Sequence, residues 1–180
     1  MLSSDCYYRR MPLSPKGSRF RRFLRSLADA ALLAPAGLML AFGSASALPR
    51  RVLDLPESAG RRGRAIALGL MGFLLGLTAL ILYAFAILTF ARGALFPVFD
   101  RGPYGESWGG PSLGGAWLAH FAASTAFQVV VLLLAAGIAV LARRLAAPMR
   151  GARSAWWPWP LAILICAATT LFVVAWTTQI

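Results

Sequence analysis

The chain alternates long apolar stretches with short basic ones, and this pattern predicts membrane-spanning helices. Residues 65–90, 116–141 and 157–178 are almost wholly apolar, and none of these stretches contains Asp, Glu, Lys or Arg. At about 1.5 Å per residue, a helix of each stretch is long enough to cross a bilayer core of about 30 Å. The sequence therefore predicts an all-α, helical integral membrane protein with three transmembrane helices.

An earlier segment, residues 19–48, begins with a different pattern. Apolar residues at helical spacing form one face, namely Phe20, Leu24, Leu27 and Ala31. The opposite face carries Arg21, Arg22, Arg25 and Asp29. This arrangement is typical of an amphipathic helix on an anionic membrane surface. We therefore expect anionic lipid to bind through Arg21, Arg22 and Arg25.

Three interpretations fit the second half of this segment, residues 30–48. The stretch is apolar but contains Pro35 and Gly37. It crosses the membrane, enters it and returns, or forms the apolar part of a secretory signal that ends at residues 44–47. The basic residues Arg50 and Arg51 follow at once, which disfavours a signal peptide because translocated chain usually avoids positive charge.

The composition agrees with a membrane class. Hydrophobic residues make up 59% of the 180 and charged residues only 13%, and the mean hydropathy is +0.68. Soluble domains are about 45–50% apolar and about 25% charged. The net charge is +12, but 17 of the 18 basic residues are arginine and they cluster beside apolar segments. Orientation in a membrane accounts for them, and we expect no nucleic-acid binding because no aromatic-basic recognition module is present.

The distribution of basic residues predicts the topology. If residues 30–48 do not cross, 16 basic residues share one side of the membrane and only Arg92 and Arg101 lie on the other. If they do cross, the split is nine against nine. Because an excess of Lys and Arg marks the cytoplasmic side, we expect three spans in a bacterial inner membrane, with a cytoplasmic N-terminus. A four-helix transmembrane bundle is the alternative.

These observations divide the chain into four parts. We expect a disordered basic cytoplasmic tail over 1–18, an amphipathic or re-entrant segment over 19–48, a basic cytoplasmic linker over 49–64 and a transmembrane domain over 65–180, with spans at about 65–90, 116–141 and 157–178 and an outer loop at 91–115.

A polar stripe marks the second long span. His120, Ser124 and Gln128 follow one another at intervals of four residues and therefore share one helical face. Polar side chains in hydrocarbon normally face a bundle interior or a wet cavity. The stripe is interpreted either as a proton-sensitive or ligand-binding surface with His120 as its titrating member, or as hydrogen bonding to a neighbouring helix.

Three glycines in the first long span predict close helix packing. Gly69, Gly72 and Gly76 lie near one face, and the last two form the small-xxx-small pattern that lets helix backbones approach. The partner is another helix of the same chain, a second copy or another protein.

The outer loop combines glycines with Asp100, Tyr104, Glu106 and Trp108. Such a loop covers a cavity mouth or binds an extracytoplasmic ligand, or it is a structural cap whose aromatics lie at the membrane interface. Nothing near Asp100 and Glu106 would bind a substrate, so they are a poor candidate for a catalytic pair.

No catalytic constellation is evident, so we expect neither enzymatic activity nor a cofactor. The one histidine has no second metal ligand at a suitable spacing, and we expect no metal site. Cys6 and Cys166 are expected at different depths, which argues against a disulfide.

The stretch from about residue 65 to 150 resembles the sensor domain that precedes many actinobacterial sensor histidine kinases, and also small actinobacterial membrane proteins. The resemblance rests on Phe96-Pro97, on Ser107-Trp-Gly-Gly-Pro111 and on the run from Gly137 to Arg144. Because no phosphoacceptor helix or ATP-binding domain follows in this sequence, a sensor of this kind would pass its signal to a separate protein.

We therefore expect a non-enzymatic, sensor-like membrane protein that signals through a separate membrane-protein partner or a homo-oligomer. A structural or accessory subunit of a membrane complex is the alternative, and a small oligomeric transporter is the third possibility.

Overall fold

The protein is all-helical over the residues that its computed structural model describes, 15–44, 46–56, 62–153 and 155–178. The elements are α1 (Pro15–Ala41), α2 (Ala47–Leu53), α3 (Arg62–Ala94), α4 (Phe96–Phe99), α5 (Leu113–Ala146), the 3-10 helix η1 (Ala147–Arg150) and α6 (Pro158–Thr177). Most of the predicted tail lies outside the described residues, although the first turn of α1 begins at Pro15.

Four helical segments are long and apolar enough to cross a membrane. They are Ser18–Ala41, Arg62–Ala94, Leu113–Arg150 and Pro158–Thr177. The prediction of an all-α membrane protein is therefore confirmed. The charge count favoured three crossings, whereas by length and composition all four helices qualify, as in the four-helix alternative.

Helix α1 differs from the segment expected over residues 19–48. It runs unbroken through Pro35 and Gly37, so the chain does not return at these residues. The turn comes later, where Gly43 adopts a φ of 81° that favours glycine. There the Gly43 N–H donates to the Leu40 carbonyl and the Ser44 N–H to the Met39 carbonyl, a Schellman-type helix end. The expected linker likewise contains a helix, α2.

Helices α1 and α3 pack antiparallel and at close range. Gly76 lies against the backbone of Ala34, and Gly69 lies against the backbones of Gly37 and Ala41. Near the middle of α1, the Tyr83 hydroxyl donates a hydrogen bond of 2.8 Å to the Leu27 carbonyl. The three glycines predicted to pack a helix therefore face α1 of the same chain.

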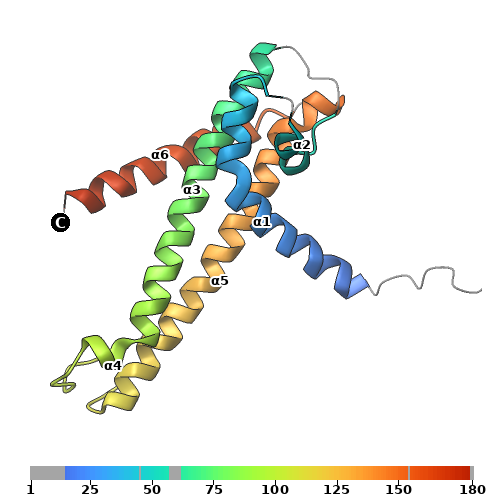
Figure 1. Cartoon of the computed structure of the whole chain (residues 1–180). Coiled ribbons are helices and arrows are strands. Elements are labelled where there is room, and N and C mark those ends of the chain that lie inside the picture. The colour runs from blue at the N-terminus through green and yellow to red at the C-terminus, as the bar shows by residue number, and fades with distance from the viewer. Residues whose placement is uncertain (1–14, 45, 57–61, 154, 179–180) are drawn as a thin grey trace, which may run out of the picture.

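Helices α3 and α5 run side by side in opposite directions (Figure 1). We call the end where α4 and residues 100–112 join them the loop end, and the end where α2 and η1 lie the charged end. The core is at the charged end, where its largest buried side chains include Leu33, Val52, Leu53, Leu68 and Leu75.

Helix α6 leaves the charged end at a wide angle to α5 (Figure 1). Only Pro158 and Ala162 are buried along its length. Its contacts with α3 include aromatic rings, since Phe85 meets Phe172 and Trp176 at centroid distances of 5.1 Å each. Its exposed apolar surface suits contact with lipid or with another protein.

Candidate functional site

At the loop end, the loop and α5 form an open hollow of about 420 Å³. The residues lining it are Asp100, Glu106, Ser107, Trp108, His120 and Ala123. Four of them, Asp100, Glu106, Trp108 and His120, were selected from the sequence, where they belonged to two separate features. The fold brings these two features together, and we call this site the loop hollow.

The loop holds its shape through local hydrogen bonds. The Asp100 carboxylate accepts from the Gly102 N–H at 3.0 Å, and the Tyr104 hydroxyl donates to the Asp100 carbonyl at 2.9 Å. Tyr104 therefore supports the loop rather than lining the hollow. Further along, Gly109 has a φ of 98° and leaves no room for a Cβ, which would overlap the backbone of Gly115.

The His120 ring is fixed on two sides. Its Nδ1–H donates to the Ala116 carbonyl one turn earlier at 2.8 Å. The ring also stacks on Phe96 of α4, with a centroid distance of 4.1 Å and an interplanar angle of 18°. Because a carbonyl accepts only, this bond assigns the proton to Nδ1, and Nε2 of the neutral ring is a hydrogen-bond acceptor.

The other two members of the polar stripe contact α3 instead of the hollow. Ser124 is buried and packs against Gly93, where a Cβ would overlap the serine side chain. The Gln128 amide donates to the Ala86 carbonyl and to the Thr89 hydroxyl. Gln128 therefore hydrogen-bonds across to α3, whereas the Ser124 hydroxyl donates to the Phe121 carbonyl of its own helix at 2.9 Å. Of the three stripe residues, only His120 lines the loop hollow.

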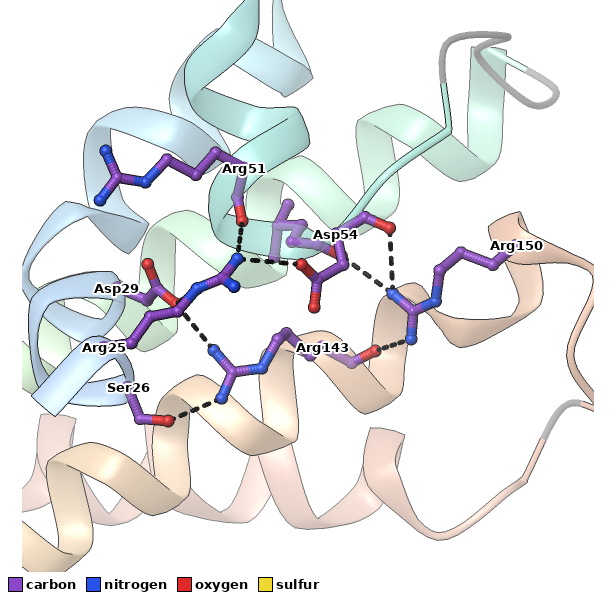
Figure 2. Close-up of polar contacts among 8 residues, drawn as sticks. Arg25, Ser26, Asp29, Arg51, Asp54, Arg143 and Arg150 are labelled. Atoms are coloured by element: carbon purple, nitrogen blue, oxygen red, sulfur yellow. Dashed lines mark hydrogen bonds and ion pairs between the residues drawn. The ribbon is translucent and has the colours of Figure 1, made fainter. Parts of the chain in front are cut away.

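A second polar centre lies at the charged end, and it was not foreseen from the sequence. Figure 2 shows Asp29 of α1 facing Arg143 of α5. The Asp29 side chain is 0% exposed, and its Oδ2 accepts from Arg143 Nη1 at 3.0 Å. The other guanidinium nitrogen of Arg143 donates to the Ser26 hydroxyl at 2.8 Å. A charge-assisted contact therefore joins two helices that are far apart in the sequence.

Arginines extend this centre to α2 and η1 (Figure 2). Arg25 lies between two carboxylates, 3.6 Å from Asp29 and 3.3 Å from Asp54. Arg150 donates to the carbonyls of Leu53 at 3.0 Å and Arg143 at 2.9 Å. We call Arg25, Ser26, Asp29, Asp54, Arg143 and Arg150 the charged cluster.

The charged cluster changes the expectation for the arginines of α1. Arg25 was predicted to bind anionic lipid together with Arg21 and Arg22, but its guanidinium contacts Asp29 and Asp54. Arg21 and Arg22 are exposed, and Arg22 hydrogen-bonds to Ser18. Within α1, the exposed positive charge available to a membrane surface therefore lies mainly before Arg25.

A signal for the cluster was present in the sequence. Asp29 directly precedes an apolar run, and Arg143 closes another. Ionisable side chains in or beside membrane helices almost always pair, so Asp29 and Arg143 are each expected to have a partner of opposite charge. The amphipathic pattern instead assigned Asp29 to a solvated face, which is why the pair was missed.

The described residues contain no group of three or more His, Cys, Asp or Glu side chains that could hold a metal ion. Comparison with family models, with curated proteins and with solved structures gives no match to this chain. The resemblance to actinobacterial sensor domains therefore stays a prediction that rests on the quoted motifs.

Proposed function

We propose that the protein is a non-enzymatic, sensor-like protein of the bacterial inner membrane that signals through a separate partner. The observation that carries the proposal is that one helix, α5, holds a residue of each polar centre. His120 lines the loop hollow near one end of α5, and Arg143 joins the charged cluster near the other.

The geometry of α5 supports a link between the two centres. Arg143 lies 23 positions after His120, which corresponds to about 35 Å of helix at about 1.5 Å per residue. Between the two centres, the Gln128 amide of α5 donates a hydrogen bond to the Ala86 carbonyl of α3. A ligand that displaces the His120 end would shift this helix against α3, and a shift of about 1–2 Å is typical of signalling helices.

The orientation follows from charge. With α1 not crossing, the 16 to 2 distribution of basic residues supports a cytoplasmic charged end and a cytoplasmic N-terminal tail, with the loop hollow outside. Arg21 and Arg22 would then meet anionic lipid on the inner leaflet. A partner that receives the signal would contact the charged end, where α1, α2, α5 and η1 meet.

Distance measurements test this proposal. Spin labels would be attached to Arg21→Cys and Arg153→Cys in a chain with Cys6→Ser and Cys166→Ser, reconstituted in lipid nanodiscs. We expect Trp108→Ala and His120→Gln to shift the distance between the labels by about 1–2 Å. Leu133→Ala, an exposed site midway along α5, is the matched control and should leave the distance unchanged. An unchanged distance in both hollow variants would show that α5 does not transmit changes from the loop hollow to the charged end.

One observation favours the second candidate, an accessory subunit of a membrane complex. The apolar helix α6 is exposed along most of its length, including Leu164, Leu171 and Val174. A subunit predicts that Leu164→Gln with Leu171→Gln removes a co-purifying protein while the isolated chain keeps its thermal stability. If no stoichiometric protein accompanies the wild-type chain in mild detergent, the subunit role is ruled out.

A further inference from the structure

The loop hollow has a charge opposite to that of the rest of the chain. Its lining includes two carboxylates, Asp100 and Glu106, and no arginine or lysine. The whole chain carries a net charge of +12. A concave site lined by one sign of charge concentrates ions of the other sign, so this hollow attracts cations and repels anions.

The hydrogen-bonding groups of the hollow are mainly acceptors. Glu106 is exposed and makes no hydrogen bond or ion pair within the part of the chain that the structure describes. Asp100 uses Oδ1 for the Gly102 N–H, which leaves Oδ2 available. The Nδ1–H of His120 is held by the Ala116 carbonyl, so Nε2 of the neutral ring is an acceptor. A ligand that satisfies these groups must bring N–H or O–H donors.

The size and the aromatic lining argue for an organic cation over a metal ion. A hollow of about 420 Å³ is far larger than a bare ion requires, and no metal-type grouping includes these side chains among the described residues. Trp108 is 75% exposed at this site. An indole face attracts ammonium groups through its quadrupole and also covers their alkyl portion.

We propose that the loop hollow binds a small organic cation, a protonated amine whose N–H groups donate to Glu106, Asp100 and His120 while Trp108 covers its alkyl part. This inference rests on the proposed function and names the chemical class of the signal. The carboxylates attract the positive charge of the amine, and the fixed His120 ring orients its N–H group. Trp108 favours an organic group over an inorganic ion.

Calorimetric titration of the full chain in zwitterionic-lipid nanodiscs tests the ligand class, with empty nanodiscs as the blank. The probes are putrescine, tetramethylammonium, which lacks N–H donors, magnesium ions and acetate. We expect saturable binding of putrescine, weaker binding of tetramethylammonium and none of acetate. Glu106→Gln should weaken putrescine binding about tenfold or more, because it removes a charge-assisted hydrogen bond.

Leu133→Ala, an exposed site on α5 that belongs to neither polar centre, is the control and should bind putrescine like the wild type. The proposal would be overturned if putrescine did not bind saturably, or if Glu106→Gln bound putrescine as tightly as the wild type. Tighter binding of magnesium than of putrescine would also overturn it. The spin-label experiment separates this failure from failure of the sensor function. Hollow variants that shift the labels without any amine binding leave the function standing and reject the ligand class. Amine binding without a change in the distance between the labels would support the ligand class and reject the sensor function.

Discussion

Asp29 is the residue on which the charged end depends most. It is 0% exposed on a helix that is otherwise apolar over its second half, and its Oδ1 has no hydrogen-bond partner within the described residues. A buried charge is costly unless it is paired and hydrogen-bonded. Arg143 provides the short contact that offsets this cost, and Arg25 adds a longer one at 3.6 Å.

The two carboxylates of the charged cluster provide a matched pair of variants. Asp29→Asn leaves Arg143 without its buried partner and should lower the free energy of unfolding by about 3 kcal/mol, the scale of a broken buried pair. Asp54→Asn breaks only a pair whose side chains are about half exposed, and should cost less than about 1 kcal/mol. Unfolding in mixed micelles measures both values.

A double variant checks the cause. Asp29→Asn combined with Arg143→Gln removes both charges and should recover part of the loss. If Asp29→Asn and Asp54→Asn lowered the free energy of unfolding equally, the buried pair of Asp29 would contribute no more stability than the exposed pair of Asp54.

Single residues were predictable where their chemistry was unusual for a membrane segment. Asp100, Glu106, Trp108 and His120 stood out in the sequence because polar and aromatic side chains gather there between apolar stretches. The sequence did not indicate that they line one hollow, since that depends on the turn of α4 and on the stacking of Phe96 with His120. The Asp29–Arg143 pair joins residues 114 positions apart, and the local pattern indicates that each side chain needs a partner of opposite charge without identifying that partner.

Among the helices, α1 and α3 pack closely because both have small residues where they meet, so their backbones can approach. The Gly72–Gly76 pattern predicted close packing but not the partner, because the pattern alone does not identify the facing helix. The partner helix carries its own small residues at helical spacing, Ala34, Gly37 and Ala41, which meet Gly69 and Gly76. Recognising that second row in the sequence would have identified the pair.

The glycines of α3 differ in how much room they leave, which gives a second matched pair. A Cβ at Gly76 would overlap the backbone of Ala34, whereas a Cβ at Gly72 would make ordinary contacts at 3.6 Å and beyond. Gly76→Ala should therefore lower the free energy of unfolding by about 1–3 kcal/mol, the typical cost of overpacking. Gly72→Ala should be close to neutral. Thermal aggregation of the detergent-solubilised protein ranks the two variants, and the reverse order would contradict the packing described here.

Each uninterrupted apolar stretch corresponds to one helix of the structure. Residues 65–90, 116–141 and 157–178 lie within α3, within α5 and over α6. Between residues 19 and 64 the pattern was ambiguous because Pro35 suggested a break. The helix continues through this proline, and packing of α1 against α3 offsets the hydrogen bond that proline removes.

At the scale of the whole molecule, the side of the membrane reached by the start of α1 distinguishes three crossings from four. The charge distribution supports a cytoplasmic tail. We therefore expect Ser18→Cys, in a chain without its native cysteines, to react with a membrane-impermeant maleimide only in inside-out vesicles. Reaction in right-side-out vesicles would show that α1 crosses as a fourth span.

In the topology that we propose, α5 crosses the bilayer with the loop hollow outside and the charged cluster in the cytoplasm. Two single cysteines test it most directly, Gly105→Cys in the loop and Ala152→Cys after η1, both at exposed positions where the backbone tolerates a side chain. We expect an impermeant maleimide to label Gly105→Cys in right-side-out vesicles and Ala152→Cys only in inside-out vesicles. Labelling of both cysteines from the same side would contradict it.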